Sequence, residues 1–363
     1  MTPPPLILQA YRQPQRLADW SAADWDLLLR QSVAAYLLAG LLALVEEHGL
    51  LARLPDQVRE HLEWARTLAE RHQQGVRYEV AMITRALAGC ELPLILLKGA
   101  AYTMAGLPAA RGRLYSDVDI LVPAASLPDV EAALMMHGWA ATHHDAYDQR
   151  YYRVWMHELP PMRHVLRNAV IDVHHAILPL TARVRPDPDK LRAAAAPIAG
   201  AEGLYTLAPA DLVLHSAVHL FYDGEFDHGL RDLVDIHRLL LHFGADPAFW
   251  PALTARAAEL QLARPLFYAL RYCAQLLHTP VPADAVRAAA GAAPGPLLLG
   301  LMDFLFHRAL LPVHASCNDR WSAPARFCLY LRGNWLRMPP PLLARHLFHK
   351  AFLSPKEAKK QRE

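Results

Sequence analysis

Apolar residues recur at helical spacing through the first part of the chain. Ser21 and Asp24 form a capping-box pattern ahead of an apolar run, which predicts a helix over residues 22–48 that Gly49 ends. A second helical region extends from Pro55 to about residue 87 and is interrupted only by Gly75. The first ninety residues are therefore expected to form helices.

Strand-like patterns replace the helical spacing further along. Residues 94–97 form a short apolar run that ends at the pair Lys98 and Gly99, and an Ala-rich segment follows. In SDVDILV, period-two alternation places Asp117 and Asp119 on one face and apolar side chains on the other. This pattern predicts two strands, the first of which leads directly into a helix.

A third strand is expected in AVIDVHHAIL, where alternation places Asp172 on one face with Val170 and His174, opposite Ile171 and Val173. Residues 139–155 mix His, Tyr and Asp in another strand-like pattern. Residues 127–137 instead predict a helix, and a long helical region is expected from Pro209 to about residue 348.

These elements predict a fold of the α+β class that is predominantly helical, with a small mixed sheet at its centre. The expected organisation is an N-terminal helical segment (1–90), an α/β core (91–205), a C-terminal helical domain (206–350) and a basic tail (351–363). Three units fit a chain of 363 residues that is 53% hydrophobic and has the capacity to bury a large core.

Net charge, cysteine spacing and the length of the apolar runs argue against several classes of protein. The net charge of +2 gives no global reason to expect nucleic-acid binding, although the end of the chain is locally basic. The four cysteines show no Cys-x-x-Cys spacing, so neither a zinc knuckle nor a disulfide framework is indicated. The longest apolar run, residues 33–45, is shorter than the roughly 20 residues that a bilayer span needs, and the N-terminus has no signal-peptide pattern. We expect a cytoplasmic protein without a membrane partner.

The two aspartates of SDVDILV are the strongest candidates for chemistry. Side chains two residues apart on a strand lie about 6.6 Å apart, so Asp117 and Asp119 both reach one cleft. Carboxylates select hard cations such as Mg²⁺ or Mn²⁺, and a pair of them supports displacement at phosphorus. Lys98 and Gly99 lie where a strand feeds a helix N-terminus, a position that attracts phosphate. The competing interpretation is a solvated edge strand whose acids face water.

Taken together, LLKGAAY, an arginine (Arg113) four residues before Asp117, and SDVDILV resemble the uncharacterised nucleotidyltransferase family of the polymerase-beta-like nucleotidyltransferase superfamily. Asp172 in VIDVHH resembles the third carboxylate of that superfamily, and HSAVHLFYDGEFDHGLRDLVDIHRLL resembles the helical part of the family. The resemblance covers roughly residues 94–240. The chain departs from the wider superfamily at the first motif, where Lys98 and Gly99 replace a Gly-Ser pair.

The resemblance implies a nucleotidyltransferase core and the transfer of a nucleoside monophosphate from a nucleoside triphosphate, ATP among them, to an acceptor hydroxyl. It implies that Asp117, Asp119 and Asp172 hold Mg²⁺ or Mn²⁺, and that Asp172 also orients or deprotonates the acceptor. The acceptor stays open between a small molecule, a protein or peptide, and an RNA end. The alternative is a catalytically weak nucleotide-binding or partner-binding module with the same fold.

The resemblance also assigns the triphosphate to four residues: Lys98, Gly99, Arg113 and Ser116. Lys98 would meet phosphate as a point charge, or it would reach from the core edge to pair with an acid. Replacing Asp117 or Asp119 by Asn is expected to abolish metal-dependent activity with little loss of stability.

Several other polar residues have two interpretations. His215 and His219 have the i, i+4 spacing of metal ligands, but no glutamate stands between them as a metalloprotease needs, so zinc hydrolysis is disfavoured. Asp232 and Asp235 either border the nucleotide cleft or pair with nearby arginines. His174 and His175 are expected to have packing roles.

Overall fold

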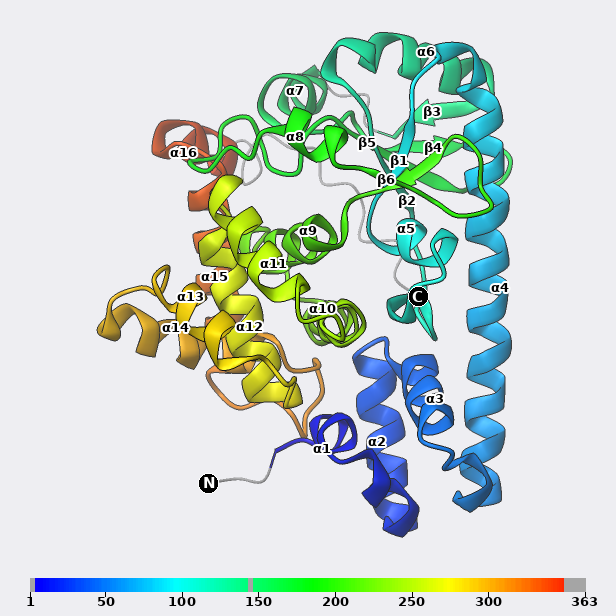
Figure 1. Cartoon of the computed structure of the whole chain (residues 1–363), viewed down its shortest axis with the longest axis vertical. Coiled ribbons are helices and arrows are strands. Elements are labelled where there is room, and N and C mark those ends of the chain that lie inside the picture. Colours follow the sequence, from blue (N-terminus) through cyan, green and yellow to red (C-terminus); the bar gives the residue numbers. More distant parts are fainter. Residues whose placement is uncertain (1–3, 143–145, 349–363) are drawn as a thin grey trace.

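The computed structural model describes residues 4–142 and 146–348, in which helices surround one mixed sheet (Figure 1). The N-terminal helices are α1 (Leu6–Arg12), α2 (Ala22–Ala34), α3 (Leu38–Glu47) and α4 (Asp56–Ala86). The strands are β1 (Leu94–Leu96), β2 (Val118–Leu121), β3 (Trp139–Ala141), β4 (Met162–His164), β5 (Val170–His174), β6 (Ala196–Pro197) and β7 (Leu204–Thr206).

Short helices connect the strands, and a helical array follows the sheet. The connecting helices are α5 (Lys98–Met104), α6 (Leu127–Met136), α7 (Ala146–Arg150) and α8 (Pro188–Ala193). The later helices are α9 (Pro209–Tyr222), α10 (Gly229–Phe243), α11 (Phe249–Glu259), α12 (Ala263–Leu277), α13 (Ala283–Ala290), α14 (Pro296–Ala309), α15 (Ser322–Arg337) and α16 (Pro340–Phe348). The predominantly helical α+β fold expected from the sequence is confirmed. The basic tail expected at 351–363 lies outside the described residues.

The seven strands form one sheet in the order β3-β4-β5-β2-β1-β7-β6. At its centre, β2 pairs in parallel with β5 and antiparallel with β1, while β1 pairs in parallel with β7. The sheet is therefore mixed, as the sequence predicted. β2 is buried along its whole length. The face of β2 that carries the acidic side chains is therefore not a solvent-facing side of the sheet. The interpretation of Asp117 and Asp119 as the acids of a solvated edge strand does not hold, because β2 lies between β1 and β5.

The helix expected over residues 22–48 is two helices. The capping box at Ser21 and Asp24 is present and starts α2, but the chain leaves the helical conformation after Ala34. Tyr36 has a left-handed φ of 57°, and the chain resumes as α3 at Leu38. The reason is long-range: the break lets α3 pack against α4, a contact that local apolar spacing does not encode.

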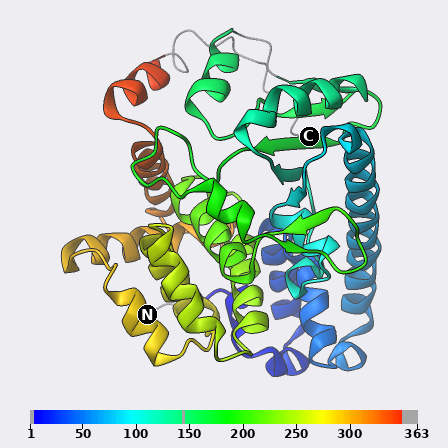
Figure 2. The ribbon, with the colours of Figure 1, turned by 45° about the horizontal axis from the view of Figure 1, so that its top comes forward.

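Helix α4 runs without interruption through Gly75, which the sequence pattern marked as a break. It extends along one side of the molecule beside the sheet (Figures 1 and 2). Its side chains also anchor α5 and the segment that follows it: Arg77 donates to the Thr103 carbonyl of α5, and Gln73 donates to the Ala110 carbonyl beyond it. This long helix therefore supports the loop that precedes the aspartates.

The strand-like prediction for residues 139–155 is mostly wrong. Of the residues in this range that the structure describes, only Trp139–Ala141 form a strand, and Tyr151–Trp155 continues from α7 as a turn of π-helix. The error arises because aromatic residues favour strands on average. Here Tyr147 and Tyr151 are spaced four apart, as on a helix, and pack edge to face against Trp155, at 6.0 and 6.2 Å between ring centroids.

One cluster of buried side chains extends from Ile7 to Leu329 and includes residues of β1, β2, α5, α9 and α10. Within the part of the chain that the structure describes, no helix has both the length and the apolar character needed to cross a membrane. The Tyr102 hydroxyl of α5 contacts the Ser216 hydroxyl of α9 at 2.6 Å, which ties the first strand-helix unit to the helical half.

Candidate active site

Strands β2 and β5 place two of the three predicted acids side by side. In this parallel pair, Asp119 stands in register with Asp172, and Asp117 immediately precedes β2. Neighbouring strands lie about 4.8 Å apart, and residues in register point to the same face. The structure therefore brings Asp119 and Asp172 together through sheet pairing between segments about fifty residues apart in the sequence.

Asp119 is 4% exposed and contacts a lysine and a histidine. One of its oxygens, Oδ1, lies 3.2 Å from the Lys98 ammonium and 2.9 Å from Nε2 of His174. Burial by itself raises the pKa of Asp119, but Lys98 and His174 outweigh burial and hold the pKa well below its usual range. Asp119 is therefore ionised at any working pH.

His174 has a different role from the packing role that the sequence indicated. Its other ring nitrogen, Nδ1, lies 3.1 Å from an oxygen of Glu158, so the imidazole sits between two carboxylates. The alternation of β5 already placed His174 on the same face as Asp172, which was the available signal. Glu158 had no such signal, because an isolated antiparallel bridge opposite His174 brings it to the site.

Asp172 is an ionisable group whose environment disfavours its charge. Its Oδ1 atom is buried and has no hydrogen-bond partner among the described residues. Burial, together with the charges of Asp119, Asp117 and Glu158, raises the pKa of Asp172 to about 8. Carboxylates crowded in this way are stabilised by a bound cation, so the donor set fits a hard divalent metal ion.

We expect Asp172→Asn to stabilise the metal-free protein at alkaline pH. The folded-state pKa lies above the ordinary value of 3.8, so the folded state loses stability as pH rises from that value through about 8. A neutral amide removes this loss and should raise the melting temperature at pH 9 by about 2 °C or more, the shift that about 1 kcal/mol produces.

Thermal melts of both proteins in chelator at pH 5 and pH 9 check this expectation. The difference should be clearly larger at pH 9. An Asp172→Asn variant that melts below the wild type at pH 9 would contradict it, because it would show that the surroundings of Asp172 favour the charged carboxylate.

A cavity of about 210 Å³ lies next to these acids. Six of the seven predicted site residues line it, namely Lys98, Gly99, Arg113, Ser116, Asp117 and Asp119. Asp172 is the exception; it stands in register with Asp119 on the neighbouring strand β5. The opposite wall comes from α9, α10 and the segment between them: His219, Asp223, Glu225, Asp227, His228, Arg231 and Asp232.

The charges on the cavity wall are predominantly negative. Six carboxylates face three side chains that are always cationic, which are Lys98, Arg113 and Arg231. Such a cavity attracts cations, and it accepts a triphosphate only together with metal ions that offset both sets of charges. The acidic wall after α9 was not identified from the sequence, apart from Asp232.

Lys98 occupies the turn between β1 and α5 with a left-handed φ of 42°, a conformation that favours glycine. This is the position at which the wider superfamily was expected to have glycine. The lysine therefore keeps a glycine-like backbone and adds a charged side chain that points to Asp119. Of the two interpretations of Lys98, the pairing with an acid is the one present in this structure.

Gly99 has no room for a side chain. A Cβ atom there would lie 2.3 Å from a guanidinium nitrogen of Arg113 and 2.6 Å from the Tyr115 ring. The serine of the superfamily pattern is therefore excluded by Arg113 and Tyr115, which fill its space.

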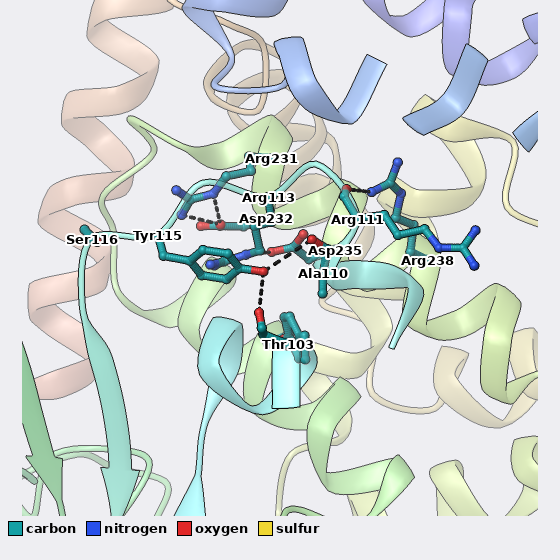
Figure 3. A network of polar contacts seen from close by, with 12 residues as sticks. Thr103, Ala110, Arg111, Arg113, Tyr115, Ser116, Arg231, Asp232, Asp235 and Arg238 are labelled. Atoms are coloured by element: carbon teal, nitrogen blue, oxygen red, sulfur yellow. Dashed lines mark hydrogen bonds and ion pairs between the residues drawn. The ribbon is translucent and has the colours of Figure 1, made fainter. Parts of the chain in front are cut away.

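Arg113 is held in place from several sides (Figure 3). Its Nε donates to Asp235 at 2.8 Å, and its guanidinium lies 5.8 Å from the centre of the Tyr102 ring and 5.3 Å from that of Tyr115. Burial disfavours its charge, but Asp235 and Asp232 outweigh burial and raise the pKa of Arg113. The tyrosine rings are fixed in turn, since the Tyr115 hydroxyl bonds Thr103 and the Ala110 carbonyl.

The two interpretations of Asp232 and Asp235 both have support. Asp232 lines the cavity and pairs with Arg231 at 2.8 Å, whereas Asp235 pairs with Arg113 and not with Arg238. Arg238 instead donates to main-chain carbonyls, including that of Gly40. The remaining predicted residue, Ser116, donates its hydroxyl to Asp117 at 3.1 Å.

A tighter group of metal-ligand side chains lies behind Asp119. Across residues 4–142 and 146–348, the set whose ligand atoms all lie within 4.8 Å of one another is His157, Glu158 and His174. The three aspartates do not converge this closely. His215 and His219 are not in the set either, although both line a small cavity beside it.

Comparison with known proteins adds one finding. The model of a family described as uncharacterised nucleotidyltransferase matches residues 21–278. The matched region starts at the cap of α2 and extends through α12, so it contains all seven strands and both walls of the cavity. No curated protein matches the chain.

Proposed function

The chain belongs to the uncharacterised nucleotidyltransferase family, and on that basis we propose that it transfers a nucleoside monophosphate from a nucleoside triphosphate to an acceptor hydroxyl, with Mg²⁺ or Mn²⁺. The observation that carries the proposal is the cavity that gathers Lys98, Gly99, Arg113, Ser116, Asp117 and Asp119 on one wall. An activity assay with each of the four nucleoside triphosphates tests it.

Asp117, Asp119 and Asp172 would hold the metal. Their fit to a hard cation rests on oxygen-only donors, on the unpartnered Oδ1 of Asp172 and on the mutual repulsion that raises its pKa to about 8. When bound, the ion would neutralise charge that develops on the phosphoryl oxygens. Asp172 stands beside Asp119 on the neighbouring strand and is the candidate for orienting the acceptor hydroxyl and taking its proton.

Lys98, Gly99, Arg113 and Ser116 would bind the triphosphate. Lys98 pairs with Asp119 here, and a cation held by Asp119 would free its ammonium to meet a phosphate oxygen. Gly99 lines the cavity, where its backbone would contact a phosphate, because Arg113 and Tyr115 already fill its Cβ position. Arg113 is fixed by Asp235 and the tyrosine rings, so its guanidinium would present a positive charge to the triphosphate without a change of side-chain conformation.

Lys98→Ala is expected to weaken nucleoside triphosphate affinity by one to two powers of ten, about 1.4 kcal/mol for each tenfold step. The loss follows from removing the point charge nearest the turn, and it should leave the helical circular dichroism unchanged. Titration calorimetry with a non-hydrolysable triphosphate analogue and Mg²⁺ measures it.

A melting curve on the same Lys98 variant separates the two interpretations of this residue. Loss of the partner of Asp119 lowers the melting temperature in either case. Unchanged nucleotide affinity with a lower melting temperature would make Lys98 purely structural and would remove it from the proposed binding site.

A second candidate function is a catalytically weak module that binds a nucleotide or a partner. The pairing of Lys98 with Asp119 and the filling of the serine position by Arg113 favour it, because both differ from the superfamily pattern. Calorimetry that detects nucleotide binding, combined with the absence of turnover for every triphosphate, would favour this alternative.

The acceptor class and the division of the chain are part of the proposal. We keep a small molecule, a protein or peptide, and an RNA end as acceptors. The proposed division assigns residues 91–205 to the catalytic core, residues 1–90 and 206–350 to helical units that complete it, and 351–363 to a tail. The cavity supports this division, because one of its walls comes from the proposed core and the other from α9 and α10 of the 206–350 unit.

A further inference from the structure

We propose that His157, Glu158 and His174 form a separate transition-metal site that takes Zn²⁺. One nitrogen or oxygen from each side chain lies within 4.8 Å of the other two. The proposal concerns a metal other than the Mg²⁺ of the aspartates, and it stands whether or not the chain transfers nucleotides.

The main chain preorganises these three residues. Glu158 and His174 face each other across an antiparallel bridge, which places their side chains on the same face. Two further main-chain hydrogen bonds flank the bridge: Leu159 donates to Val173 at 2.9 Å, and His175 donates to the His157 carbonyl at 2.8 Å. The ligands are therefore fixed by strand pairing.

The distances suit a tetrahedral ion. Metal–nitrogen and metal–oxygen bonds of about 2.0–2.2 Å give a ligand-to-ligand separation of about 3.4 Å in a tetrahedral zinc site. Nδ1 of His174 and Oε2 of Glu158 are 3.1 Å apart. The ring of His157 lies 5.3 Å from that of His174, and its Nδ1 is buried without a hydrogen-bond partner within the described ranges.

The other side of His174 supports the assignment. Its Nε2 lies 2.9 Å from the Asp119 carboxylate. A histidine that binds a metal through one nitrogen commonly donates its other N–H to a carboxylate, which fixes the tautomer. With the proton on Nε2, the lone pair of Nδ1 points toward Glu158 and the proposed ion. Asp119 would then support this site from outside its ligand shell.

A fourth ligand has space. A cavity of about 40 Å³ borders His157 and His174 and is also lined by His215 and His219. One water molecule occupies roughly 30 Å³ of liquid, so a metal-bound water fits. Two imidazoles, one carboxylate and a water are a common zinc set, whereas Mg²⁺ prefers oxygen ligands alone. The ligand chemistry therefore separates this site from the three aspartates.

Zinc titration of chelator-treated full-length protein, followed by competition with a chromophoric chelator, tests the proposal. The wild type should bind one Zn²⁺ per chain with submicromolar affinity. His157→Ala and Glu158→Gln should each weaken that binding by at least about 100-fold. Glu158→Gln keeps the size of the side chain, so it remains informative if His157→Ala fails to fold by circular dichroism.

Two controls show whether the zinc is bound at this place. His242→Ala removes an exposed histidine of α10, and Asp117→Asn alters the aspartate site; both should bind zinc as the wild type does. The proposal is overturned if the wild type binds no stoichiometric zinc. Zinc binding that survives both ligand substitutions also overturns it, as does loading with Fe²⁺ in preference to Zn²⁺ in metal analysis.

Discussion

Asp117→Asn is expected to lower nucleotide transfer by at least about 10³-fold while leaving the melting temperature within about 1 °C. A metal ion that stabilises transition-state charge is worth several kcal/mol, and each 1.36 kcal/mol is tenfold in rate. Asp117 lines the cavity and makes no ion pair among the described residues; its hydrogen bond comes from Ser116. An amide of the same shape therefore removes the metal ligand and little else.

Asp119→Asn should abolish transfer as well, but with a cost in stability that the sequence did not indicate. Its carboxylate compensates the charge of Lys98 and contacts the His174 ring in a buried environment, so an amide leaves the Lys98 ammonium without its nearest anion. Asp26→Asn on the exposed face of α2 is the matched control and should leave transfer unchanged. An Asp117 variant with turnover within tenfold of the wild type would contradict the assignment.

Arg113→Ala should cost about 3–5 kcal/mol of unfolding free energy, the usual result of removing one partner of a buried ion pair. Asp235 is 8% exposed and would keep a buried charge without its partner. The Tyr102 and Tyr115 rings would also lose the guanidinium that packs on them. Urea unfolding of the purified variant measures the loss.

Two further variants show that the loss arises from the buried pair. Adding Asp235→Asn to Arg113→Ala should recover a large part of the stability, because it removes the unpaired charge. Arg111→Ala, at a surface ion pair whose arginine side chain is 62% exposed, should cost less than about 1 kcal/mol. A loss of that small size for Arg113→Ala would mean that the network of Figure 3 is not a structural element.

The sequence predicted the parts of the site that depend on local pattern. Alternation placed Asp117 and Asp119 on one face, and the apolar run before Lys98 gave the strand that leads into α5. The assignment of Asp172 needed the family resemblance, because no local signal says that β5 pairs with β2 in register. That pairing is made between segments about fifty residues apart.

The parts that the sequence missed all depend on contacts between distant segments. Glu158 reaches the site through a bridge to His174, and the acidic wall forms only when the segment after α9 faces β2. The break at Tyr36 likewise follows from packing between α3 and α4. Helical spacing and strand alternation describe one element at a time, so none of these features has a signature in them.

The departure from the superfamily at the first motif has a steric explanation. Lys98 keeps the left-handed backbone expected of a glycine, and Arg113 occupies the space that a serine at position 99 would need. The two residues are therefore coupled: a side chain at 99 requires that Arg113 move, and Arg113 is held by Asp235. The Lys-Gly pair and Arg113 act as one structural unit.

Transfer of a radiolabel from the α-phosphate of a nucleoside triphosphate tests the central claim most directly. The protein is incubated with Mg²⁺, fractionated cell extract as the source of acceptor, and triphosphates labelled at either the α or the γ position. We expect α-label to enter an acceptor, γ-label to leave as pyrophosphate, and Asp117→Asn to abolish both. Incorporation of γ-label, or α-label transfer that is equal in the Asp117 variant, would contradict it.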